Sequence, residues 1–213
     1  MGPEYAMSAN AGSPVRWATL TIIGFGFGGV LSSFLMGSIG RPLSQVAAGL
    51  LYIAVYGALI GAAVAVAQLV ALGRDASGRR SWVLWSGLGG AVGYVGASVV
   101  GEILGNTINP LLPIVIGEGT IEVGSGAVLG LAIGLAQRFA GTHEMARHGR
   151  WLAATVIGTG LGYGAAAGVL EFVGGPILRA NLAVTFMFIL GLFVAAAQAP
   201  IVARSGASGA SRS

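Results

Sequence analysis

The sequence contains no cysteine and no lysine, and only 8% of its 213 residues are charged. The absence of cysteine excludes disulfide bonds and thiolate chemistry, and without lysine there is no Schiff-base site for retinal. The only two histidines, His143 and His148, lie five residues apart in HEMARH, so they do not share a helix face as the zinc motif H-E-x-x-H requires. Serine nucleophiles have no base nearby. We therefore expect no enzyme, no catalytic residue, no metal site and no cofactor.

What the sequence does contain is apolar. Hydrophobic residues make up 55% of the chain, glycine occurs 38 times and the mean hydropathy is +0.84, whereas soluble domains carry about 25% charged residues. Five uncharged runs are each long enough to supply the ~20 residues of a membrane-crossing helix; they cover 17–40, 42–73, 81–101, 151–170 and 180–203. A sixth, 123–137, is shorter, but its flanking Glu122 and Arg138 can snorkel to the two interfaces. No period-2 alternation indicates a barrel, so the sequence predicts an all-α integral membrane bundle of six transmembrane helices.

The basic residues predict how these helices are oriented. Nine arginines fall on the side that carries both termini, and only Arg41 and Arg179 fall on the other. By the positive-inside rule this predicts a multi-pass protein of a bacterial inner membrane with cytoplasmic termini. Basic inner loops meeting anionic lipid explain the net charge of +4, so neither nucleic acid nor a nucleotide is expected as a partner.

The predicted domain organisation has three parts. Residues 1–15 form a cytoplasmic segment without a signal-peptide layout, and the first hydrophobic run is interpreted as a retained helix. Residues 16–204 form the transmembrane domain, and the small, polar residues 205–213 are expected to be a disordered tail.

An internal repeat divides the transmembrane domain into three helical hairpins, at about 16–73, 79–140 and 150–204. A shift of 69 residues, without a gap, aligns Gln68, Trp82 and Glu102 with Gln137, Trp151 and Glu171. A looser third copy aligns 16–29 at the N-terminus with 150–163, and at the C-terminus Gly191 and Gln198 keep the seven-residue spacing of Gly61 and Gln68. Because a hairpin crosses the membrane twice, the copies would be related by a rough threefold axis along the membrane normal.

The glycines follow this repeat. Gly24, Gly26 and Gly29 spell G-x-G-x-x-G, but the strand and the downstream acidic residue of a dinucleotide site are missing. Similar rows recur in the other hairpins as G-x-x-x-G pairs, which let membrane helices approach closely. The predicted helix-packing residues are Gly24, Gly28, Gly57, Gly61, Gly89, Gly93, Gly126, Gly130, Gly158 and Gly162.

Tryptophans and glutamines occupy matching ends of the hairpins. Trp17, Trp82 and Trp151 begin the odd-numbered helices, where an amphipathic ring is expected to anchor at the membrane interface. The glutamines Gln68, Gln137 and Gln198 are expected to form interhelical hydrogen bonds, one form of which is a bond from a tryptophan indole.

Acidic residues provide the candidate site. Glu102 and Glu171 are repeat-equivalent and lie near the outer ends of the third and fifth helices, with Arg41 at a comparable depth in the first hairpin. These side chains could be interfacial groups in contact with water, or they could form an outer cluster, with Glu118, Glu122 and Arg179 nearby. Such a cluster could clamp the hairpins together, hold a cation or dock a partner. The apolar segment 106–120 is expected to line the surface, with re-entry into the membrane as the alternative.

The stretch GAVLGLAIGLAQ at 126–137, followed by a basic loop and a Trp-led glycine-rich helix, resembles uncharacterised bacterial multi-spanning proteins with repeated Gly/Ala-Gln and Trp-Gly hairpins. The resemblance covers about 57–171. It implies the hairpin fold and no particular activity.

Two functions are consistent with these features. The first is an accessory or structural subunit whose glycine faces pack against other integral membrane proteins in a larger complex. The second is a small ion or solute channel or transporter with an outer acidic site at Glu102 and Glu171.

Overall fold

The computed structural model describes residues 13–38, 45–73, 79–108, 114–140, 149–173 and 182–210. Six helices make up this part of the chain: α2 (Pro14–Ser38), α3 (Gln45–Leu72), α4 (Arg79–Ile108), α5 (Ile114–Ala140), α7 (Gly149–Val173) and α8 (Leu182–Ala210). Each is long and apolar enough to cross a membrane, and the described residues form no strand. The protein is therefore an all-α, multi-pass membrane bundle, as predicted.

Proline and glycine set several helix boundaries. Pro14 is the first residue of α2, a position that has no helical partner for an N–H group. Gly73 has a φ of 60° and its N–H donates to the Leu69 carbonyl at 3.2 Å, which ends α3 in a left-handed turn. Pro113 immediately precedes α5.

The fourth and last helices differ from the prediction. Because α4 continues to Ile108 and α5 begins at Ile114, most of the 106–120 segment is helical and is not a separate surface segment. Glu118 and Glu122 interrupt the uncharged run there, but the helix continues through both residues. Similarly, α8 continues through Pro200 to Ala210, so the predicted disordered tail is helical over its first six residues. These six residues are serine, alanine and glycine, and even glycine costs a helix only about 1 kcal/mol relative to alanine.

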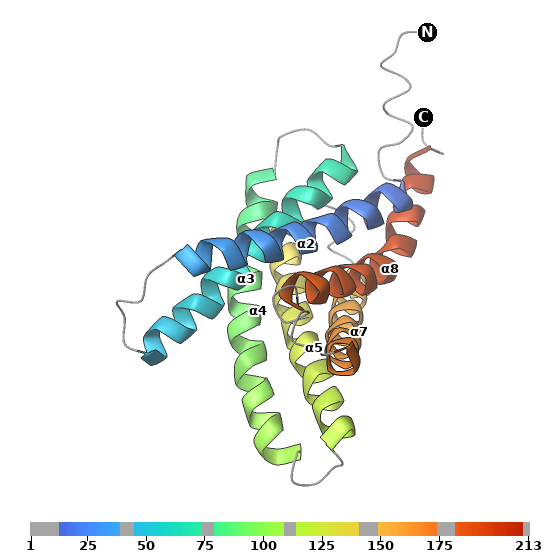
Figure 1. Ribbon diagram of the computed structural model, residues 1–213. Helices are drawn as coiled ribbons and strands as arrows, with labels where there is room; N and C mark the ends of the chain where they lie inside the picture. The colour runs from blue at the N-terminus through green and yellow to red at the C-terminus, as the bar shows by residue number, and fades with distance from the viewer. Residues whose placement is uncertain are drawn as a thin grey trace.

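The six helices form a closed ring. Each helix packs closely against two neighbours, in the order α2, α3, α4, α5, α7, α8 and back to α2. The start of α2 and the end of α8 lie together at the upper right of Figure 1, whereas the α2–α3 and α4–α5 hairpins diverge towards their turns. We call the end where α2, α4 and α7 begin the arginine end, because the described Arg16, Arg80, Arg138, Arg150 and Arg204 all lie there.

Glycines lie in the contacts that close this ring. A side-chain methyl on Gly24 would lie 2.8 Å from the Ala67 Cβ on α3, and one on Gly89 would lie 2.6 Å from the Ala136 Cβ on α5. At the α3–α4 contact, Gly57 meets the backbone carbonyl of Gly90. The other predicted pairs face the next helix of the ring in the same way; they are Gly28, Gly61, Gly93, Gly126, Gly130, Gly158 and Gly162. The glycine rows are thus covered within the chain.

The core follows one face of the second helix of each hairpin, that is, of α3, α5 and α8. Residues four apart share a helix face, and on α5 the side chains of Leu129, Ile133 and Gln137 are all buried. The same spacing on the other two helices buries Ile60, Val64 and Gln68 on α3, and Leu190, Val194 and Gln198 on α8. Two apolar layers and one layer of glutamines therefore fill the centre of the ring.

The outside of the ring is apolar. Phe34 is 72% exposed, Phe139 71% and Val92 67%, on three different helices. Side chains of this kind face hydrocarbon in a membrane bundle, which supports a lipid bilayer as the surroundings of the protein.

Candidate functional site

The three glutamines meet in one buried hydrogen-bond network. Gln137 Nε2 donates to Gln68 Oε1 at 3.2 Å, and Gln68 Nε2 donates to Gln198 Oε1 at 3.4 Å. Each is at most 1% exposed. Residues from α3, α5 and α8, which are not neighbours in the ring, are therefore joined across its centre.

Hydroxyl groups on α4 and α7, each the first helix of its hairpin, extend this network. Gln198 Nε2 donates to Thr155 Oγ1 at 3.0 Å, and Gln137 Nε2 donates to Ser86 Oγ at 3.4 Å. Ser86 and Thr155 each lie four residues after a tryptophan, and Thr21 holds the same position after Trp17. Among the described residues, Trp17 Nε1 and Thr21 Oγ1 have no hydrogen-bond partner. These two groups on α2 therefore add no hydrogen bond to the network, whereas Ser86 on α4 and Thr155 on α7 do.

The tryptophan rings form a plug, not interface anchors. Trp17, Trp82 and Trp151 are at most 1% exposed, and the ring centroid of Trp151 lies 5.5 Å from that of Trp17 and 6.4 Å from that of Trp82. Trp151 Nε1 donates to Gln137 Oε1 at 2.8 Å. The anchor prediction is corrected: the three indoles pack against one another at the centre of the helix bundle, and Trp151 also bonds to the glutamine layer, in place of contact with the lipid headgroups.

We expect Gln137→Leu to lower the free energy of unfolding by about 2 kcal/mol, because it leaves the Trp151 indole buried without an acceptor. Gln68→Leu is the matched control: it removes hydrogen bonds at the same depth but no indole partner, so its effect should be smaller. Thermal unfolding in detergent would measure both. Equal stability of Gln137→Leu and the unmodified protein would contradict the expectation.

Trp85 offers an optical test of the plug. It is 40% exposed, whereas the other three of the four tryptophans are buried. Brominated lipids quench indoles that they can contact, so we expect Trp85→Phe to remove most of the quenching in vesicles. If instead quenching persists at the level of the unmodified protein, the rings of the plug face lipid.

At the end opposite the arginines, a pocket of about 400 Å³ lies between α4, α5 and α7. Tyr94 on α4 and Tyr163 on α7 lie deepest along their helices, and Glu102 lies eight residues beyond Tyr94, about 12 Å further along the axis. The pocket is lined by Tyr94, Ala97, Ser98, Gly101, Glu102, Ile121, Glu122, Ser125 and Tyr163. It combines two carboxylates, hydroxyl groups and an apolar wall.

Contacts across the ring hold the tyrosines of the pocket in place. The Tyr94 hydroxyl donates to Met187 Sδ at 3.6 Å, and its ring packs edge-on against Tyr56, with centroids 5.4 Å apart. Tyr163 packs edge-on against Phe186 at 4.7 Å. Four helices thus fix the base of the pocket, which is a preformed surface.

The carboxylates differ in their surroundings. Glu102 is exposed at the mouth, whereas Glu122 is half-buried and lies on the same face of α5 as Ser125, which is only 6% exposed. Water screens an exposed charge strongly and a half-buried one less. Glu122 is therefore the stronger electrostatic element of the pocket.

Of the predicted outer cluster, the structure places Glu102 in the pocket. Arg41, Arg179 and the side chains of Glu118 and Glu171 lie outside the described residues. Glu122, which the sequence places near this cluster, also lines the pocket. Its position could have been found from spacing, because Glu122 and Ser125 continue the face of α5 that carries Leu129, Ile133 and Gln137.

Comparison of the chain with protein-family models, curated proteins and solved structures gives no match. The function is therefore argued from the pocket.

Proposed function

We propose that the protein is a small membrane transporter that binds an organic cation in the carboxylate pocket. The observation that carries this proposal is the convergence of Glu102 and Glu122 on one cavity at the end of a closed helix ring. Two carboxylates at a water-accessible mouth attract positive charge. An ammonium group would accordingly enter with its charge towards them.

The size and lining of the pocket favour an organic cation. Its volume lies within the range of about 300–1,000 Å³ typical of small-molecule sites. Ala97, Gly101 and Ile121 provide an apolar wall, and the rings of Tyr94 and Tyr163 can interact with an ammonium group through their π faces. Ser98 and Ser125 add hydroxyl groups that can accept hydrogen bonds from it.

The glycine rows bear on the choice between the two functions. An accessory subunit needs small-residue surfaces free for its partners, but the described glycine pairs are covered by neighbouring helices of the same chain. The feature that favoured a subunit is thus used to close the ring. This supports the solute-binding function over membership of a complex.

Transport would require the layers below the pocket to separate. The apolar layers, the glutamines and the tryptophan plug fill the axis between the pocket and the arginine end. A cation bound beside Tyr94 would press on the Tyr94–Met187 contact, which joins opposite sides of the ring. We expect passage to proceed by movement of the hairpins against each other, since the described side chains of these layers are buried against one another.

Tetramethylammonium is a suitable first probe, with sodium at the same ionic strength as its control. Binding to the folded state should raise the unfolding temperature with increasing concentration, by an amount equivalent to about 2.7 kcal/mol at 100 times Kd. Uptake of the labelled probe into proteoliposomes then tests transport. Equal stabilisation by sodium would overturn the proposed binding, and binding without uptake would overturn the transport step. Co-purification of stoichiometric membrane proteins would favour the accessory subunit instead.

A further inference from the structure

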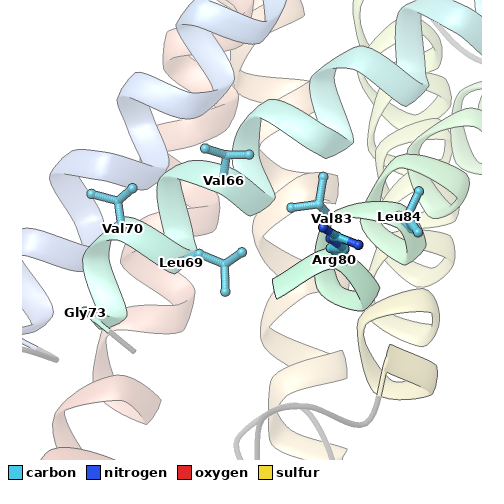
Figure 2. A pocket seen from close by; sticks show the side chains of 7 residues that line it. All are labelled: Val66, Leu69, Val70, Gly73, Arg80, Val83 and Leu84. Carbon is cyan, nitrogen blue, oxygen red and sulfur yellow. The ribbon is translucent and has the colours of Figure 1, made fainter. Parts of the chain in front are cut away.

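A second cavity lies on the outside of the ring at the arginine end, far from the carboxylate pocket. It is a groove of about 690 Å³ between the last turns of α3 and the first turns of α4. Figure 2 shows Val66, Leu69 and Val70 on α3 and Val83 and Leu84 on α4 around it. Apart from one arginine, its lining side chains are aliphatic.

The floor and walls of the groove differ in exposure. Leu69 is only 7% exposed and forms part of the core cluster around the tryptophans, so it closes the groove from below. Val66, Val70 and Leu84 are 49%, 52% and 66% exposed and form the rim. Surfaces of this kind take up a hydrocarbon chain in a bilayer.

Arg80 gives the groove a charge at its mouth. It lies on the first turn of α4, level with Gly73, whose left-handed backbone ends α3. Arg80 is exposed, and among the described residues it has no carboxylate partner. A guanidinium group pairs with phosphate through two parallel hydrogen bonds.

The residues that line the groove are not repeated at the equivalent junction between α5 and α7. A shift of 69 residues places Arg138 at the position of Leu69, Phe139 at that of Val70 and Gly149 at that of Arg80. The α5–α7 junction therefore lacks the aliphatic floor of the α3–α4 groove. At its start, α7 also lacks an arginine at the position that corresponds to Arg80.

We propose that this groove is a binding site for one anionic phospholipid, with its phosphate on Arg80 and an acyl chain along the α3–α4 groove. The occupant follows from charge complementarity and from the position of the groove at the membrane surface. The arginine end is predicted to be cytoplasmic, and that leaflet holds the anionic lipids.

Native mass spectrometry of the purified protein would test the site with phosphatidylglycerol and phosphatidylcholine of identical acyl chains. We expect one phosphatidylglycerol to bind about fivefold more tightly than phosphatidylcholine, the ratio that corresponds to one arginine near the surface. Arg80→Gln should abolish this preference, and Arg80→Lys should retain part of it. Val70→Trp should fill the groove and lower the occupancy of both lipids.

Arg150→Gln is the matched control, because Arg150 is an exposed arginine at the start of α7 on the other side of the ring. It should retain the preference for phosphatidylglycerol. The proposal is overturned if Arg80→Gln keeps the full preference, or if Arg150→Gln reduces it as much. In either case a general attraction between the basic end and anionic lipid would account for binding.

Discussion

Gly90→Leu is expected to prevent the ring from closing between α3 and α4. The Cα of Gly90 lies against the backbone of Gly57, and any side chain there would overlap the Gly57 carbonyl. Backbone atoms cannot rotate away as a side chain does, so the helices must separate. Adding even one methylene to a packed core costs about 1–3 kcal/mol; four carbons against backbone should cost more than ~3 kcal/mol. Size-exclusion chromatography and thermal unfolding in detergent would measure the loss of folded protein.

Gly168→Leu on α7 is the control for this substitution. A side-chain methyl at Gly168 would have no heavy atom within 4 Å, and the position is exposed. The same change in hydrophobicity should therefore leave folding intact. Equal yields and unfolding temperatures for the two variants would contradict the assignment of Gly90 to a close backbone contact.

Glu122→Gln is expected to weaken the binding of tetramethylammonium by about tenfold, which corresponds to about 1.4 kcal/mol, because it removes a half-buried negative charge whose attraction to the cation is only partly screened by water. Glu102→Gln should have a smaller effect, since Glu102 is exposed at the mouth and its charge is screened. Isothermal titration calorimetry would give both dissociation constants.

Glu144→Gln provides the control for net charge. In the sequence, Glu144 falls between the end of α5 and the start of α7. It should leave the dissociation constant unchanged. If all three variants weaken binding equally, the effect comes from the overall charge of the protein and the pocket has no special part in it.

The six helices could be predicted from the sequence because the cost of burying charge in lipid confines the charged residues to their ends. The length of α5 was underestimated for the same reason. The sequence places Glu122 at the end of the predicted span, but a carboxylate that lines a pocket does not end a helix. The pocket therefore explains both the charge and the extra helical turns.

The glutamine layer also followed from the sequence, because the 69-residue spacing places Gln68 and Gln137 at the same depth. The direction of the tryptophans did not. A tryptophan that begins a membrane helix normally anchors at the interface, and only the closed ring shows that Trp17, Trp82 and Trp151 converge on one axis. Which helices are neighbours is a property of the whole chain, and residue spacing along one helix does not contain it.

The most direct test of the proposed function is equilibrium dialysis of radiolabelled tetramethylammonium against the purified protein. The proposal predicts saturable binding of one cation per chain, lost in the folded double variant Glu102→Gln, Glu122→Gln and retained in Glu144→Gln. Binding that is absent from the folded, unmodified protein, or unchanged in the double variant, would contradict a cation site in this pocket.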